Sequence, residues 1–113
     1  ILRHRDIPNI ASLEAYRASR QSRPSDPAID EETMNRIGYV LLRGKKAKDA
    51  IEVFSQNAAD YPESWNVHDS LGEACAADGQ TERAIKAYER SLQLNPANAG
   101  GADALKKLRA VSR

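Results

Sequence analysis

Three adjacent residues, His68, Asp69 and Ser70, have the side chains of a hydrolase triad. A working triad needs the histidine to contact both the hydroxyl and the carboxylate. Successive helical residues point about 100° apart, so three neighbours on one helix cannot converge in this way. The sequence also lacks the Gly-x-Ser-x-Gly motif that exposes a nucleophilic serine. We therefore expect no catalytic residues in this chain.

A metal site is the second chemistry to consider. The histidines are His4 and His68, and Cys75 is the single cysteine. On one helix His68 and Cys75 would share a face, but the two turns between them span about 10 Å, too far for a common zinc ion. We expect both residues in a helical core, and we expect neither a metal ion nor a cofactor.

Two basic clusters, in residues 17–23 and 43–48, raise RNA binding as a minor alternative. Aromatic residues that could stack on bases are not interleaved with them. The 17 Lys and Arg residues nearly balance the 16 Asp and Glu residues, so the net charge of +1 gives no general attraction to nucleic acid or acidic membranes. No apolar run is long enough to cross a bilayer. Solvated surface charge is the simpler interpretation, and we expect no membrane partner.

The elements that position these residues belong to an internal repeat. Residues 31–64 align with residues 65–98 without a gap, and 4 positions are then identical. We call the offset between these two ranges the repeat period, and a fixed period of such length is the signature of a repeat architecture. The matched pairs are Ile37 with Leu71, Gly38 with Gly72, Ala50 with Ala84, Ile51 with Ile85, Phe54 with Tyr88, and Pro62 with Pro96.

Apolar residues recur at helical spacing in both halves of each unit. In the first unit Met34, Ile37 and Leu41 lie on one helical face, and a second stripe runs through 47–58. Glycine-containing turns separate the halves, and a proline closes each unit. Asp30 precedes the first stripe as a helix N-cap. The sequence therefore predicts an all-α fold of antiparallel helix hairpins.

The two glycines within the helices need a reason, because glycine in a helix interior costs about 1 kcal/mol relative to alanine. We expect Gly38 and Gly72 to let the partner helix of each hairpin approach closely. Ala50 and Ala84 would be the small residues that face them. The aromatic residues Phe54 and Tyr88 would then fill the space between successive hairpins.

The period and its residues resemble the tetratricopeptide repeat (TPR) family, whose 34-residue units carry a W-x2-L-G-x2-Y, A-x3-F and P pattern. The second unit matches it with Leu71, Gly72, Ala84, Tyr88 and Pro96, whereas Met34 and His68 replace the tryptophan and Cys75 replaces the tyrosine. The resemblance implies a right-handed superhelical stack of two TPR units, with a flanking N-terminal helix and a C-terminal capping helix.

We interpret the chain as a fragment of a longer protein, because it starts at Ile1 without a methionine or a targeting signal. We assign no compartment on this basis. Apolar residues at helical spacing precede Pro24 and follow Pro96, which predicts the flanking helices. The expected segments are an extended linker from an upstream region (1–8), an N-terminal helix and linker (9–30), TPR unit 1 (31–64), TPR unit 2 (65–98) and a C-terminal capping helix (99–113).

By resemblance, the first helix of each TPR unit lines a concave groove. Asp69 and Glu73 beside Tyr39 and Leu42 would hold an extended peptide that bears a basic residue, and a solvated polar face is the alternative. Some TPRs bind C-terminal carboxylates with a lysine and asparagine clamp, but Asn35 and Tyr39 stand at those places here. The expected groove residues are Glu32, Asn35, Tyr39, Leu42, Arg43, Asn66, Asp69, Glu73, Ala76 and Ala77.

The resemblance favours a protein-protein interaction or scaffolding module, with a protein or peptide, an upstream domain of the same chain or a second copy as partner. An alternative is an accessory C-terminal tail that stabilises, dimerises or positions an enzyme. The stretches 13–17, 34–42 and 61–74 are similar to TPR tails of bacterial esterase-like and β-lactamase-like serine hydrolases. Under either hypothesis this fragment is not itself the enzyme.

Overall fold

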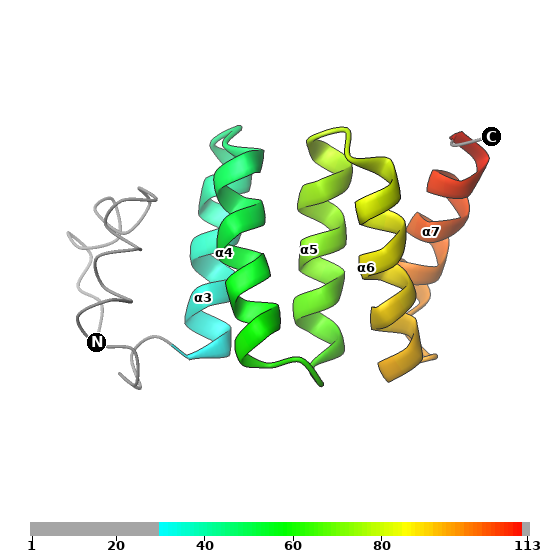
Figure 1. The fold of residues 1–113 in the computed structure, drawn as a ribbon, viewed down its shortest axis with the longest axis horizontal. Coiled ribbons are helices and arrows are strands. Elements are labelled where there is room, and N and C mark those ends of the chain that lie inside the picture. The colour runs from blue at the N-terminus through cyan, green and yellow to red at the C-terminus, as the bar shows by residue number, and fades with distance from the viewer. Residues whose placement is uncertain (1–29, 112–113) are drawn as a thin grey trace.

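The computed structural model describes residues 30–111, which form helices without strands. Figure 1 shows the helices side by side in antiparallel order. The predictions for the linker and the N-terminal helix lie outside the described residues. The helices are α3 (Glu31–Arg43), α4 (Ala47–Asp60), α5 (Trp65–Ala77), α6 (Thr81–Leu94) and α7 (Ala99–Val111).

The helices recur with the repeat period seen in the sequence. Helices α3, α5 and α7 begin at 31, 65 and 99, and α4 and α6 begin at 47 and 81. We call α3, α5 and α7 the A helices, and α4 and α6 the B helices. Helix α7 thus has the register of a third A helix. The predicted all-α stack of hairpins is confirmed.

Two of the three residues that precede the A helices cap the helix start with their side chains. Asp30 accepts a hydrogen bond from the Thr33 amide at 2.9 Å, which lowers the pKa of its carboxyl group. Asn98 accepts one from the Gly101 amide at 3.1 Å. Ser64 instead donates its hydroxyl hydrogen to the Glu31 carboxylate at 2.6 Å. The N-cap predicted at Asp30 is therefore present.

The turn between the A and B helices also repeats. Lys45 and Gly79 have φ angles of 62° and 78°, the left-handed conformation, and stand one repeat period apart. The amides that follow them reach back to the Leu41 and Cys75 carbonyl oxygens, both at 2.9 Å, as in a Schellman helix end. Glycine adopts this conformation without strain, whereas for lysine it costs about 1 kcal/mol.

Each mid-helix glycine faces an aromatic ring. A β-carbon at Gly38 would overlap the ring of Phe54, and one at Gly72 would lie 2.9 Å from the ring of Tyr88. The expectation that Ala50 and Ala84 alone face the glycines is therefore corrected, because the atoms nearest to each glycine belong to the aromatic ring one helical turn beyond that alanine. The glycines make room for this ring within the hairpin.

A buried hydrogen bond ties each B helix to its A helix. The Asn57 side-chain amide donates to the Glu31 carbonyl oxygen at 3.1 Å, and Ser91 donates to the Trp65 carbonyl oxygen at 2.9 Å. Asn57 and Ser91 stand one repeat period apart. Both units therefore have this contact, with an amide as the donor in the first unit and a hydroxyl in the second. Within residues 30–111, Oδ1 of Asn57 is a buried side-chain atom without a hydrogen-bond partner.

Candidate functional site

The centre of the predicted groove is a polar cluster between α3 and α5. Tyr39 donates to Oε1 of Glu73 at 3.0 Å, and Ser70 donates to Oδ1 of Asn35 at 2.7 Å. The two hydroxyl oxygens lie 3.2 Å apart. Two hydroxyl hydrogens cannot fill three such contacts at once, so the long Tyr39–Ser70 contact competes with the two shorter bonds.

Burial disfavours the deprotonated, charged form of Tyr39. It raises the pKa of the phenol from 10.0 to about 12, with a lowering effect from the Ser70 hydrogen bond and a further rise from the Glu73 carboxylate. Tyr39 is therefore a neutral hydrogen-bond donor at physiological pH. Its ring also contacts Phe54 edge-on, with the centroids 5.2 Å apart. The rigid core of the first hairpin thus fixes the hydroxyl that orients Glu73.

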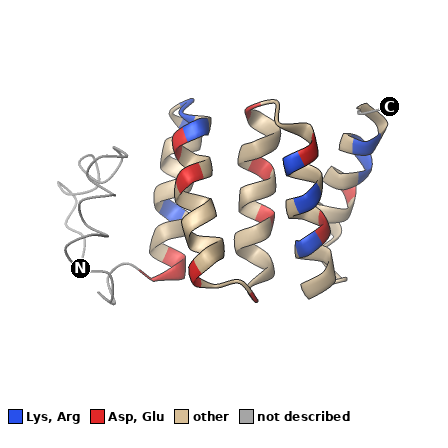
Figure 2. Cartoon of the chain, in the orientation of Figure 1, with Lys and Arg blue, Asp and Glu red and all other residues tan. Residues whose placement is uncertain are grey.

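Asp69, one helical turn before Glu73, is held from the other side. Its Oδ1 accepts a hydrogen bond from the Asn98 side-chain amide at 2.9 Å. The same amide donates to the Ser91 hydroxyl at 3.0 Å. One carboxylate oxygen of each acidic residue is therefore used for positioning. The two carboxylates lie on α5, which carries no lysine or arginine (Figure 2).

The turn end of the predicted groove has a different character. Leu42 and Ala77 line a hollow of about 510 Å³ together with the lysine-rich turn before α4. The guanidinium carbon of Arg43 lies 5.9 Å from the centroid of the Tyr39 ring, within cation–π range. The turn end therefore combines apolar groups with charges of both signs, because Asp49 and Asp78 also line the hollow, whereas the centre is acidic.

Three predicted groove residues contribute less to this surface. Glu32 is exposed near the start of α3, and Asn66 is half-buried at the start of α5. Ala76 packs against the hydrophobic core and offers little surface to a ligand. The acidic centre, the turn end with its mixed lining and these flanks are thus separate parts of the predicted set.

Most of the residues predicted to define the repeat are buried. Leu71 is half-buried against the core, and the two closing prolines are exposed because they lie in loops. Burial of one helix stripe against the next is what the repeat pattern demands. The buried members are Ile37, Gly38, Ala50, Phe54, Gly72, Ala84 and Tyr88.

The triad-like residues have separate partners. Nε2 of His68 lies 2.9 Å from the Pro62 carbonyl oxygen, whereas Asp69 contacts Asn98 and Ser70 contacts Asn35. Cys75 is fully buried, and burial raises the pKa of its thiol. Residues 30–111 contain no group of three His, Cys, Asp or Glu side chains placed to hold a metal ion. Nor does any helix in this range have the length and apolarity needed to cross a membrane.

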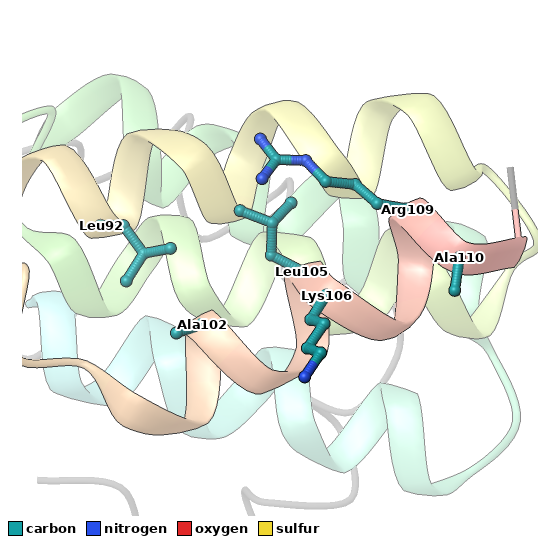
Figure 3. Close-up of a pocket in the computed structure, with 6 residues that line it drawn as sticks. All are labelled: Leu92, Ala102, Leu105, Lys106, Arg109 and Ala110. Carbon is teal, nitrogen blue, oxygen red and sulfur yellow. The ribbon is translucent and has the colours of Figure 1, made fainter. Parts of the chain in front are cut away.

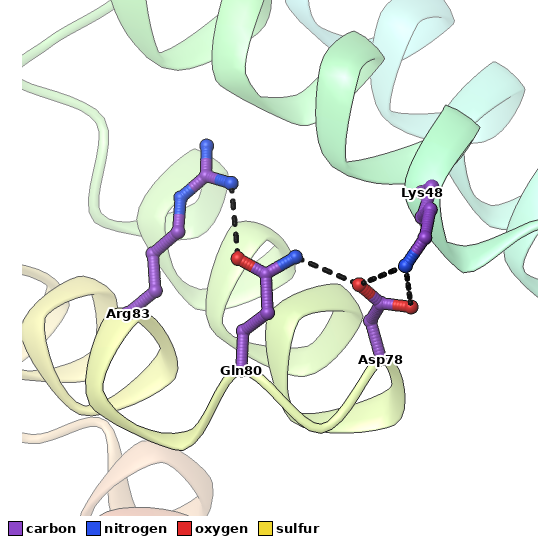
Figure 4. A network of polar contacts seen from close by, with 4 residues as sticks. All are labelled: Lys48, Asp78, Gln80 and Arg83. Carbon is purple, nitrogen blue, oxygen red and sulfur yellow. Dashed lines mark hydrogen bonds and ion pairs between the residues drawn. The ribbon is translucent and has the colours of Figure 1, made fainter.

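A polar network across the two turns was missing from the sequence analysis. Lys48 forms an ion pair with Asp78 at 3.1 Å, and Gln80 donates to Asp78 at 2.7 Å (Figure 4). These contacts lower the pKa of the Asp78 carboxyl group, the Gln80 bond most strongly. Arg83 extends the network, because it donates to Gln80 and also to Ser55. The network joins the second turn to α4.

Two other contributors, Ser70 and Asn98, were also absent from the predicted set. Ser70 occupies a stripe that is otherwise apolar, between the buried residues Val67 and Ala74. Asn98 stands one repeat period after Ser64 and two periods after Asp30, the other residues that precede A helices. The sequence did contain a signal for each residue. Ser70 is a polar residue in an apolar helix stripe, and Asn98 stands at the N-cap position of the third A helix.

A second hollow, of about 550 Å³, lies between α6 and α7 (Figure 3). Leu92 and Leu105 line it together with Lys106 and Arg109, whose side chains extend from α7 in opposite directions. Arg109 reaches across to Glu89 at 2.7 Å. By register, Lys106 occupies the position of Gly38 and Gly72, where a B helix would place its aromatic ring. Charged residues therefore occupy positions of α7 on which a third B helix would pack.

The fold and its repeated contacts define a helical-repeat scaffold of stacked hairpins. Within it, residues 65–98 match the tetratricopeptide repeat family model. No curated protein matches the sequence. The TPR resemblance is thus supported, whereas the link to serine hydrolase tails stays a prediction that rests on the sequence resemblance alone.

Solved TPR structures share the fold. The first TPR of Spaghetti (RPAP3), bound to the HSP90 peptide SRMEEVD, is 22% identical with a TM-score of 0.73, and the match covers 89% of this chain and 78% of that one. MamA 41-end from Desulfovibrio magneticus RS-1 is 23% identical with a TM-score of 0.74, covering 95% of this chain and 57% of that one. The P58(IPK) TPR domain is 21% identical with a TM-score of 0.68, covering 94% of this chain and 30% of that one. This chain therefore spans just over half of the MamA 41-end chain and under a third of the P58(IPK) TPR domain.

Proposed function

We propose that this chain is a protein-protein interaction module whose A helices bind an extended peptide that bears a basic residue. The observation that carries the proposal is the pair of carboxylates Asp69 and Glu73, held in place by Asn98 and Tyr39. Prepositioned acceptors lose little conformational entropy when they bind a cation. Stacked helical repeats commonly use such an extended surface for binding.

The negative charge of Asp69 and Glu73 favours a peptide that bears a basic residue. Each carboxylate keeps one oxygen outside the positioning bonds described above, and a hydrogen bond between such an oxygen and an Arg or Lys side chain is charge-assisted. Leu42 and the ring of Tyr39 would take an apolar neighbour of the basic residue. The HSP90 peptide bound to the Spaghetti TPR has the opposite character, with three acidic residues and one arginine. We therefore expect it to be a poor ligand for this chain.

The test compares isosteric variants that remove charge and keep hydrogen-bond acceptors. Asp69→Asn with Glu73→Gln should weaken binding of arginine-containing heptapeptides about tenfold, because a hydrogen bond to a charged group contributes about 1.5–3 kcal/mol. The probe is a fluorescein-labelled heptapeptide library with arginine fixed at one position, measured by fluorescence polarisation. SRMEEVD serves as the acidic comparison peptide.

The matched control is Asp60→Asn with Glu82→Gln, which removes the same charge from the B helices. This control should bind like the wild type, because its two residues lie outside the predicted groove. It thereby separates contact within the groove from long-range attraction to net charge. Equal binding of basic and acidic peptides by the wild-type chain would refute the proposed specificity. Equal weakening by both double variants would refute the location of the site.

A further inference from the structure

The first A helix, α3, has a face without a neighbour in the described chain. Helix α5 packs on α4 in addition to α6, and its residues Val67 and Ala74 are 0% exposed. Thr33 and Val40 stand one repeat period earlier, at the same positions on α3. Val40 is 36% exposed. Within residues 30–111, nothing occupies on α3 the place that α4 occupies on α5.

A segment before α3 has the sequence of a B helix. Residues 12–24 align with residues 84–96 of α6 and its closing loop, and 5 of the 13 positions are identical. Leu13 also aligns with Ile85. The identical pairs are Ala15 with Ala87, Tyr16 with Tyr88, Ser19 with Ser91, Gln21 with Gln93, and Pro24 with Pro96.

The matched positions are those that make a B helix pack. In α6, Ala87, Tyr88 and Ser91 are buried, and the Ser91 hydroxyl bonds to the start of α5. The closing proline ends the helix. The offset of this alignment is slightly longer than two repeat periods, so the extra residues fall between Pro24 and α3.

We propose that residues 12–24 form a B helix that packs on the Thr33 and Val40 face of α3 in the same chain. The six residues 25–30 can span about 20 Å, whereas packed helix axes lie about 8–10 Å apart. The connection is therefore long enough. The proposal is independent of the peptide groove, because neither Thr33 nor Val40 belongs to that surface.

Limited trypsin digestion of the whole chain tests the packing. Cleavage after Arg17 and Arg20 requires the segment to open, and an undocked helix of this length is marginal in water. We expect slow cleavage in the wild type and about tenfold faster cleavage in Val40→Glu, because protection follows the docked population. The cleavage rate is measured by mass spectrometry. Val111→Glu, a matched change at an exposed valine of α7, should cleave like the wild type.

A second variant keeps the test independent of damage to α3. Tyr16→Glu lies in the segment and leaves the described helices unchanged, and it should accelerate cleavage as Val40→Glu does. Wild-type cleavage as fast as that of a synthetic peptide of residues 9–24 would overturn the proposal. Protection that disappears on dilution would assign the segment to a second copy and would also overturn packing within one chain.

Discussion

At the scale of single residues, the repeat works through a contact between a glycine and an aromatic ring. Gly38 lies against the ring of Phe54, which is fully buried and cannot move aside. Gly72 and Tyr88 repeat the contact with slightly more room. The cost of glycine in a helix is therefore offset by packing of a large ring in the hairpin.

Gly38→Ala should lower the free energy of unfolding by about 1–3 kcal/mol, because overpacking a core outweighs the gain in helix propensity. Urea denaturation followed by circular dichroism measures the change. Gly72→Ala should cost less. Gly100→Ala, whose β-carbon would lie 3.8 Å from Asn98, is the control and should be neutral or stabilising. A neutral Gly38→Ala would contradict the packing described here.

The raised pKa of Tyr39 predicts that the stability of the fold decreases at alkaline pH. Its pKa is raised from 10.0 to about 12, so it supports the fold fully below pH 10. Between pH 10 and 12 the unfolded chain loses this proton first, and stability falls. Tyr39→Phe should flatten the decline of the melting temperature above pH 10. Tyr61→Phe, an exposed tyrosine at the end of α4, controls for loss of a hydroxyl, and an equal flattening there would argue against this role.

At the scale of elements, the residue that precedes α7 joins three helices. Asn98 caps α7 through the Gly101 amide and donates to Asp69 of α5 and Ser91 of α6. All its side-chain hydrogen-bonding groups are thus engaged at the boundary of the second unit. Asn98 therefore links the start of α7 to both helices of the second unit.

Asn98→Ala should destabilise the chain by about 2 kcal/mol, because it removes a cap and leaves buried partners without a donor. Amide hydrogen exchange should increase first in α7, since this helix loses its attachment. Asn95→Ala is the control, because Asn95 accepts only the Ala97 amide at 3.2 Å in the same loop. A uniform increase in exchange along the chain would show that Asn98 supports the whole stack instead.

At the scale of the whole molecule, the sequence of α7 disfavours the packing of a further B helix on it. The positions that hold Met34, Gly38 and Leu41 in α3 hold Ala102, Lys106 and Arg109 in α7. A lysine side chain at the glycine position excludes the ring of a following B helix. These three α7 residues are exposed, and a polar outer face of this kind is typical of capping repeats.

Lys106→Gly with Arg109→Leu should expose an apolar surface on α7 that promotes self-association. Removal of both charges opens the apolar hollow over Leu92 and Leu105, so we expect association that depends on concentration. Light scattering coupled to size-exclusion chromatography measures the mass. Lys107→Gly, at a lysine that pairs with Asp103 on the exposed side of α7, should leave the mass unchanged. A double variant with unchanged mass would show that the two charges do not control the end of the stack.

The sequence by itself determined the all-α fold, the hairpins and the repeat period, because helix stripes, caps and turns depend on neighbours only a few residues apart. Tertiary structure alone decided that Gly38 faces Phe54, that Asn98 holds Asp69, and that Lys48 meets Asp78. Those contacts join residues far apart in the chain, and their existence depends on the distance and rotation between packed helices. The identity of a residue does not specify that geometry.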